Sequence, residues 1–457
     1  MFNRWNVGRA EMRFEGRTAL GSRVFSGLAP LKELVRPYYL KWLYFRWKKE
    51  NYPRSFKKCW EYPTTGIAAF LERSESEQGN RRDLVFLPMA DWHLYTQRSQ
   101  HFATSLASMG YRCFYVNPHL GREFPQTYFN SPSVLVSTLG QRLLELHIHL
   151  LLEPVFHCRR LRSNETAIIT NAIETVLGTA SSARPALIVS FPVWQDVAFQ
   201  LRERLGCKVI YDCHDLMAGF EDISEDLLEA EQRLFTDCDL IVFSARQLME
   251  SILGQHPGLR GKAVLMRNAV DLADFPACVS RDGSNARGAQ KVIGYVGALN
   301  SWFDTESVRL AALAHPELRF VLVGPVASRK LDVLRSIPNI LFLGQVPYRE
   351  VASHLSKMDV AIIPFLSCPL TLATNPIKLY EYFACGLPVV STRLPEMDQF
   401  PGLVYLADNP DEFLVQIEKA LQEDDPALRS RRRDVARQES WMARCAQLVE
   451  EIRKLDA

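Results

Sequence analysis

The chain has 457 residues, roughly two to three times the length of a typical domain, so two domains are expected. Its composition, 47% hydrophobic and 23% charged, is typical of soluble globular proteins and excludes a largely disordered or collagen-like chain. The net charge of +2 excludes a protein that binds polyanions through its overall charge.

The N-terminal part differs in charge from the rest. Residues 1–60 hold 14 Lys or Arg against 4 Glu, a local charge of +10 that leaves −8 for the remainder. We therefore expect residues 1–82 to form a basic, aromatic extension. Within it, residues 36–62 interleave aromatic and basic side chains, a pattern that favours the anionic inner face of a membrane. The same pattern could stack on single-stranded nucleic acid or pack as an arm on the core. We prefer the membrane and expect no nucleic-acid partner.

Several features predict a cytoplasmic protein. The ten cysteines are scattered without a CxxC pair, which favours reduced, buried thiols over a disulfide scaffold or a zinc ribbon. We also find neither an apolar run of membrane-spanning length nor the apolar core of a signal peptide. The expected location is the cytoplasm, with peripheral attachment to the membrane.

From residue 83 onward, short apolar runs alternate with segments of helical period. The runs hold four to seven apolar residues and are continuous, as in parallel strands buried on both faces. Residues 97–109 and 194–205 are amphipathic and lie between such runs. This alternation predicts a doubly wound sheet over residues 83–280.

A second domain of the same design follows. The polar stretch 281–290 is expected to be a linker, residues 291–430 a second α/β domain, and residues 431–457 a C-terminal helix. The carboxyl ends of the strands in the two domains are expected to face a cleft, where nucleotide ligands bind.

The strongest local pattern lies in residues 372–392. Asn375 before Pro376 predicts a helix start, because Asn caps free amides and Pro has no amide to leave unbonded. Lys378 would then lie at the positive end of the helix, an arrangement suited to a diphosphate. Glu381, three residues on, could accept hydrogen bonds from ribose hydroxyls. The alternative is an ordinary helix with a surface Lys–Glu pair.

Several segments in order resemble glycosyltransferase family 4. They are the stretch 372–392, the "RNAVD" segment at 267–271, "VIGYVGALNSWFD" at 292–304 and the later strand segments "FVLVGP" and "ILFLGQ". The resemblance runs from about residue 84 to about residue 413 and includes the bacterial teichuronic acid and exopolysaccharide type.

The resemblance implies the GT-B fold, two Rossmann-like domains with the donor in the second and the acceptor at the first. It implies a hexosyltransferase that moves a sugar from a nucleotide sugar to a glycan or lipid-linked acceptor in cell-surface polysaccharide synthesis. Transfer is expected with retention, the leaving phosphate oxygen taking the acceptor proton. No DxD pair ends a strand, so neither a metal nor another cofactor is expected.

Donor and acceptor residues follow from the resemblance and from position. On the donor side, Gly297 ends a strand, where it either admits a phosphate or forms a turn. Gln345 and Val346 follow a later strand, where they either bind the base or pack at the strand end. The donor-side residues are Gly297, Gln345, Val346, Asn375, Lys378 and Glu381. Two departures from the family are Ala373, where a first glutamate is usual, and Trp302, Phe303 and Asp304, where a basic pair is usual.

The first domain supplies the predicted catalytic and acceptor residues. His214 and Asp215 end a strand, and we expect them to contact the acceptor hydroxyl or a phosphate unless their role is structural. Trp92, Arg98 and Gln100 are expected on the acceptor side, where Arg98 contacts an anionic acceptor or is solvated on a helix surface.

Two other functions stay open at this point. The departures from the family pattern would suit a GT-B scaffold that binds a nucleotide sugar or a partner without turnover. A sugar-nucleotide epimerase would share the fold and convert its donor without an acceptor.

Overall fold

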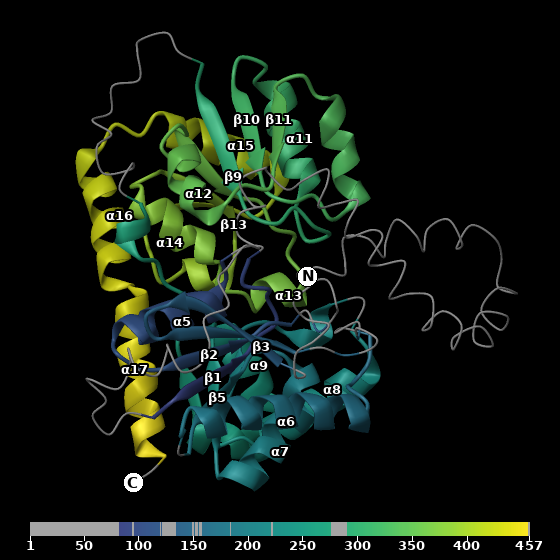
Figure 1. The fold of residues 1–457 in the computed structure, drawn as a ribbon. Coiled ribbons are helices and arrows are strands. Elements are labelled where there is room, and N and C mark those ends of the chain that lie inside the picture. The colour runs from purple at the N-terminus through teal and green to yellow at the C-terminus, as the bar shows by residue number, and fades with distance from the viewer. Residues whose placement is uncertain are drawn as a thin grey trace, which may run out of the picture. The chain divides into compact units, whose positions relative to one another are not determined.

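A computed structural model describes residues 82–93, 96–118, 120, 134–148, 150, 154, 158–182, 184–220, 223–275 and 290–455 (Figure 1). The proposed membrane segment 36–62 and nearly all of the expected linker 281–290 lie outside these residues. The described residues form two compact units, one made of 82–212 and 223–241, the other of 213–220 and 242–455.

The first sheet has eight strands in the order β3-β4-β2-β1-β5-β6-β7-β8. Most predicted strands are present and buried along their whole length, which confirms that continuous apolar runs mark parallel strands here. Their bounds are β1 Leu84–Leu87, β2 Cys113–Val116, β3 Val134–Gly140, β4 Leu143–Ile148, β5 Ala186–Val189, β6 Lys208–Cys213, β7 Leu240–Phe243 and β8 Ala263–Leu265.

The antiparallel hairpin β3–β4 was not predicted. Glu145 and His147 interrupt the apolar run of β4, although the whole strand is buried. Helices α5 Arg98–Ser108, α6 Ser163–Thr179, α7 Gln195–Leu205, α8 Glu225–Asp237 and α9 Arg246–Gln255 accompany this sheet in the chain. Short 3-10 turns are η4 Pro192–Trp194, η5 Met217–Gly219, η6 Pro257–Lys262 and η7 Leu272–Asp274.

The second sheet has six strands in the order β11-β10-β9-β12-β13-β14, and the paired strands are parallel. Numbered within this sheet, that order is 3-2-1-4-5-6, the doubly wound order of dinucleotide-binding sheets. The order reverses between β9 and β12. The bounds are β9 Val292–Val296, β10 Arg319–Val323, β11 Ile340–Gly344, β12 Val360–Ile363, β13 Val389–Thr392 and β14 Val404–Ala407.

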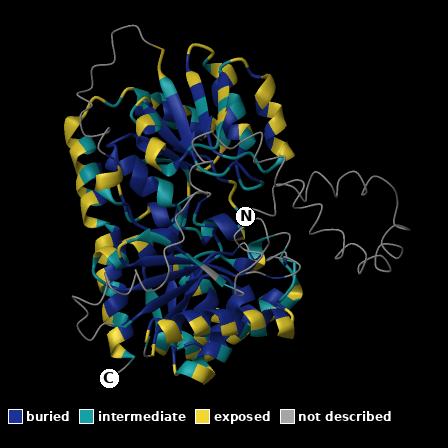
Figure 2. Ribbon diagram, in the orientation of Figure 1, coloured by how far each residue is buried: buried dark blue, intermediate teal, exposed yellow. Residues whose placement is uncertain are grey.

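The helices in the second half of the chain keep polar residues outward, and Figure 2 shows exposed positions on helices and buried positions along the strands. They are α11 Thr305–Ala314, α12 Tyr348–Leu355, α13 Pro369–Leu372, α14 Ile377–Ala384, α15 Pro410–Leu421, α16 Pro426–Gln438 and α17 Trp441–Lys454, with η8 Arg329–Ser336 and η9 Pro395–Met397. The C-terminal segment thus forms two helices, the first starting at Pro426.

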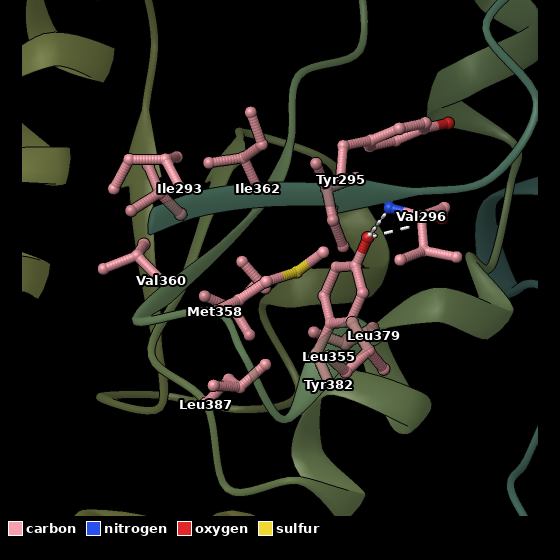
Figure 3. Packing of buried hydrophobic residues seen from close by; sticks show 14 of the residues in the cluster. Ile293, Tyr295, Val296, Leu355, Met358, Val360, Ile362, Leu379, Tyr382 and Leu387 are labelled. Carbon is pink, nitrogen blue, oxygen red and sulfur yellow. Dashed lines mark hydrogen bonds between the residues drawn. The ribbon is translucent and has the colours of Figure 1, made fainter. Parts of the chain in front are cut away.

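The core of the second unit fixes α14 to the central strand β9 (Figure 3). The hydroxyl of Tyr382 on α14 accepts a hydrogen bond of 2.9 Å from the amide of Val296, the last residue of β9. Met358 packs where a side chain at Gly294 would otherwise lie. Helix α14 therefore has a defined position beside the end of β9.

Candidate active site

The point where the strand order reverses, between β9 and β12, carries a lysine. Ligands of open α/β sheets bind at the carboxyl ends of the strands at such a point. The Lys378 ammonium on α14 lies 5.6 Å from the ring centre of Tyr295 in β9 and 4.9 Å from that of Phe365 just after β12. Both rings are within cation–π range, so they hold the ammonium at this edge of the sheet.

Gly297 makes room for this lysine. It has φ of +149°, and a Cβ here would come within 2.8 Å of the Lys378 Cε. Its amide donates to the carbonyl of Val323 at 2.9 Å, so that amide is already used within the sheet. Besides the predicted approach of a phosphate, the passage of the Lys378 side chain is thus a second reason for a glycine at position 297.

Burial and neighbouring carboxylates have opposite effects on the pKa of Lys378. Burial lowers its pKa to about 8, while the carboxylates of Glu381 and Asp215 act in the opposite direction. A half-buried ammonium with incomplete compensation gains from an anionic ligand. The geometry therefore favours an anion at this point of the sheet.

Glu381 lies one turn after Lys378 and is 7% exposed. Burial raises its pKa to about 7, and the charge of Lys378 and the hydroxyl of Tyr348 work against that rise. Asp274 adds to it by repulsion. Glu381 is thus a buried acceptor with a lysine on one side and a tyrosine hydroxyl on the other, which suits recognition of ligand hydroxyls.

Residues 345–348 bring the tyrosine to this carboxylate. Gln345 and Val346 follow β11 and are half-buried, and Tyr348 begins α12 two residues later. The Tyr348 ring packs edge-on against Phe275, with 6.3 Å between ring centres. Asp274, whose pKa rises to about 6 through burial and the nearby Asp271, lies beside the same cluster. Tyr348 and Asp274 were not predicted, although Val346, a predicted donor residue, lies two positions before Tyr348.

Asn375 does not cap α14, which corrects the predicted helix start. The N-cap is Pro376, and the helix has no side-chain cap among the described residues. The Asn375 side chain instead accepts from the amide of Asn268 at 2.8 Å and donates to Tyr380 and Glu396 at 3.0 and 2.9 Å. Its side chain is therefore committed to internal bonds.

His214 and Asp215 directly follow β6 of the first sheet, and they group with Lys378 in the second compact unit. Their loop packs on α13, where a Cβ at Gly219 would meet Leu370. The Nε2 of His214 lies 3.7 Å from the Oδ2 of Asp215, and Ser244 donates to the His214 carbonyl at 2.8 Å. Asp215 influences the pKa of Lys378, so this member of the predicted catalytic pair lies near one of the predicted donor residues.

Arg98, predicted on the acceptor side or solvated on a helix surface, is buried. Its guanidinium pairs with Asp212 at 2.8 Å, and both side chains are at most 3% exposed. Gln100 accepts from the amide of Gln97 and donates to a backbone carbonyl, as part of the start of α5. Trp92 is half-buried and packs edge-on against Tyr115 at 4.9 Å. These side chains have internal partners in the first unit.

A buried polar cluster in the first unit was missed altogether. Glu145 of β4 contacts His93 at 2.8 Å and His147 at 3.1 Å, and it accepts from Asn117 at 2.6 Å. Burial alone would raise the Glu145 pKa, but the two histidines hold it well below its usual range. Because the hairpin was not predicted, neither was this cluster.

The residues at the family's usual ionic positions have structural roles. Asp304 caps α11 by accepting from the amides of Glu306 and Ser307, each at 3.1 Å. Phe303 is buried, and Trp302 packs edge-on against Phe220 at 6.5 Å. Ala373 is buried at the end of α13. Lys378 is therefore the basic group that the described site places at the reversal point.

Three further observations concern the described residues alone. No three His, Cys, Asp or Glu side chains among them are arranged to hold a metal ion. None of their helices has the length and hydropathy needed to cross a bilayer. The expectation of reduced cysteines holds for seven of them, but Cys385 is disulfide-bonded, which corrects that expectation at one position.

Comparisons with known proteins show what the chain is similar to. Residues 290–423 match the family described as Glycosyl transferases group 1. The chain is 30% identical over 253 residues to the teichuronic acid biosynthesis glycosyltransferase TuaH of Bacillus subtilis, covering 51% of this chain. The match spans 64% of the length of that relative.

Solved structures share the fold. Sucrose-phosphate synthase from Thermosynechococcus elongatus matches 82% of this chain and 99% of its own, with a TM-score of 0.64 and 18% identity. HepE from Anabaena, in complex with UDP and glucose, matches 81% of this chain and 99% of its own, with a TM-score of 0.56 and 16% identity. These findings agree with the resemblance noted in the sequence: the chain has the GT-B fold, and its residues 290–423 match the glycosyl transferases group 1 family.

Proposed function

We propose that the protein is a glycosyltransferase that moves a sugar from a nucleotide sugar to a glycan or lipid-linked acceptor in polysaccharide synthesis. The observation that carries the proposal is the position of Lys378, an ammonium held between Tyr295 and Phe365 where the strand order reverses. The likeness to TuaH supports the polysaccharide context.

The donor would bind by its diphosphate and its ribose. Lys378 and the uncapped amides at the start of α14 would neutralise the diphosphate, which leaves no need for a resident metal. Glu381, whose raised pKa marks it as a costly buried charge, would accept from the ribose hydroxyls. Gln345 and Val346, which lead from β11 to Tyr348, would contact the base.

Transfer would proceed on one face of the sugar, with retention. The bond between the anomeric carbon and the diphosphate oxygen breaks as the acceptor oxygen bonds to that carbon, and the acceptor proton passes to the leaving phosphate oxygen. Positive charge at Lys378 stabilises the negative charge that develops on the diphosphate. His214 and Asp215, in the same compact unit, would orient the acceptor hydroxyl or the phosphate.

Residues 36–62 would hold the enzyme on the anionic inner face of a membrane, near a lipid-linked acceptor. This part of the proposal rests on the sequence pattern alone, because the segment lies outside the described residues.

The test is thermal stabilisation of the purified protein by UDP-glucose, GDP-mannose, ADP-glucose and CMP-sialic acid without added metal. A ligand at a hundred times its dissociation constant adds about 2.7 kcal/mol. We expect one nucleotide class to stabilise the wild type and to lose that effect in Glu381→Ala and Lys378→Ala. Stabilisation that survives both substitutions would refute the site.

A second candidate is a scaffold that binds nucleotide sugars without turnover. Ala373 and the structural roles of Trp302 and Asp304 favour it, because the ionic groups usual at these positions are absent. Release of free nucleotide from the stabilising donor, with or without an acceptor, would exclude this candidate.

A further inference from the structure

We infer that Asn375, Asn268 and Glu396 are positioning residues that set the place of Lys378 and Glu381 through the start of α14. The inference rests on the proposed function, because its readout is donor binding. It adds to that function a set of residues outside the proposed donor contacts.

The N-terminal end of α14 is bonded to other segments of the chain through Asn375. The helix has eight residues and begins at Ile377 without a side-chain cap among the described residues. Its middle is tied to β9 through Tyr382 and Val296, but the first turn, which carries Lys378, precedes that contact. Whatever fixes residue 375 therefore sets the direction from which the helix starts.

The anchor is a reciprocal pair of asparagines. The Asn375 side-chain oxygen accepts from the Asn268 amide at 2.8 Å, and the Asn375 carbonyl accepts from the Asn268 side chain at 2.5 Å. Both residues are buried, at 2% and 6% exposure. Two bonds between one pair of residues fix orientation as well as distance. Because both are shielded from water, losing one bond leaves a buried polar group unsatisfied.

Glu396 accepts a hydrogen bond from the side-chain nitrogen of Asn375. Its carboxylate accepts from the Asn375 side chain at 2.9 Å, from the Arg267 guanidinium at 2.7 Å and from the amide of Arg246, the first residue of α9, at 2.7 Å. The side chain is 1% exposed. One buried carboxylate thus joins α9, the segment around Asn268 and the start of α14, and its partner Arg267 is next to Asn268 in the chain. A fully bonded buried network of this kind is rigid.

The segment that follows Asn268 also lies near Tyr348 and Glu381. Asp271 and Asp274, three and six residues on, influence the pKa of the Tyr348 hydroxyl, and Asp274 also that of Glu381. A single stretch of chain therefore anchors the helix that carries Lys378 and Glu381 and contributes charge beside Glu381. Displacing Asn268 or Asn375 should misplace both donor contacts together.

The decisive experiment exchanges the hydrogen-bond donor and the hydrogen-bond acceptor between Asn375 and Glu396. Asn375→Asp places a carboxylate against Glu396 and removes the hydrogen bond. Adding Glu396→Gln to it supplies an amide that can donate to the new carboxylate, with the net charge of the wild type. We expect Asn375→Asp to weaken binding of the stabilising nucleotide sugar at least tenfold by calorimetry, and the double substitution to recover most of that loss.

Asn409→Ala is the matched control. Asn409 caps α15 by accepting from the Glu412 amide at 2.9 Å, so its loss costs stability at a helix that packs on β13 and β14. We expect a lower melting temperature with unchanged nucleotide affinity in this variant.

Three outcomes are distinguishable. Equal affinity in the wild type, Asn375→Asp and Asn268→Ala would overturn the positioning role while the proposed function stands. A folded double substitution that binds as weakly as Asn375→Asp would overturn the pairing. A wild type that binds none of the four nucleotide sugars would overturn the proposed function and this inference with it.

Discussion

Lys378 lies with its ammonium 4.9 Å from the ring centre of Phe365, so that a residue of α14 meets the end of β12 at the reversal of the strand order. Tyr295, in β9, bounds the same ammonium from the other strand. The lysine is thus placed by two strands that are neighbours in the sheet and distant in sequence. Its chemistry depends on that placement.

Lys378→Met should abolish most nucleotide binding while keeping the fold. The methionine fills the same aromatic surroundings, so the loss reports the charge. We expect a fall in affinity of about 10- to 100-fold, in line with about 1.5–3 kcal/mol for a charge-assisted hydrogen bond. Calorimetric titration with the stabilising nucleotide sugar measures it. An unchanged affinity would contradict the role of the lysine.

Nucleotide binding should weaken as the pH rises through about 8. The Lys378 pKa is lowered to about 8, so the ammonium loses its proton in that range. The bound anion will shift the midpoint upward, because it favours the charged form. Affinity measured from pH 6.5 to 9.5 should show this decline in the wild type and not in Lys378→Met. A flat wild-type profile would argue that another group holds the anion.

Gly297→Ala should impair both folding and binding. The backbone at φ +149° disfavours any side chain, and the new Cβ would lie 2.8 Å from the Lys378 Cε. Gly206→Ala is the matched control, because Gly206 also has positive φ, +65°, but nothing lies within 4 Å of its Cβ position. We expect both variants to melt earlier and Gly297→Ala alone to lose nucleotide affinity. Equal nucleotide affinities of the two variants would show that the Lys378 side chain does not need the space at Gly297.

Glu381→Gln should move stability and binding in opposite directions. The folded-state pKa of Glu381 is raised to about 7, so its ionised carboxylate destabilises the fold. The protein is therefore most stable with Glu381 protonated, below about pH 4.5, and loses that stability as the pH rises through 7. At pH 8 the amide variant should be more stable by about 1–3 kcal/mol, since one pKa unit corresponds to about 1.4 kcal/mol. Urea unfolding and nucleotide titration on the same sample check both effects. Lower stability of the variant at pH 8 would contradict the assignment.

Glu231 offers a comparison away from the site. It is buried beside the Tyr211 hydroxyl at 2.6 Å, and burial raises its pKa to about 7. Its contribution to stability is likewise present below about pH 4.5 and lost through 7. Glu231→Gln should flatten the fall of stability between pH 5 and 8 without changing nucleotide affinity. A change in affinity would place Glu231 in the functional network.

Asp212→Ala should be strongly destabilising, because it leaves the Arg98 guanidinium buried without its carboxylate. Breaking one partner of a buried pair costs about 3–5 kcal/mol. Combining it with Arg98→Met should restore much of the stability, which urea unfolding can measure. If Asp212→Ala unfolds like the wild type, the pair is not the structural bond that the geometry indicates.

The sequence predicted the architecture well where the signal is local. A strand buried on both faces must be continuously apolar, so the strands of both sheets could be recognised from runs of four to seven residues. The stretch 372–392 likewise predicted a helix that carries Lys378 and Glu381, and α14 is that helix, although Asn375 does not cap it. Glu145 and His147 show the limit of this signal, since a buried strand that carries charged side chains looks like a surface strand.

What the sequence by itself determined was the alternation of strands and helices, the resemblance to a glycosyltransferase family and the helix that carries the candidate donor residues. Only the tertiary structure decided the partners of the polar residues. Asn375 looked like a helix cap and instead bonds Asn268, 107 positions earlier. Arg98 pairs with Asp212, 114 positions later, a partner that no local pattern indicates. Periodicity reports which face of an element is buried, whereas a buried polar group must find its partner wherever the fold brings one.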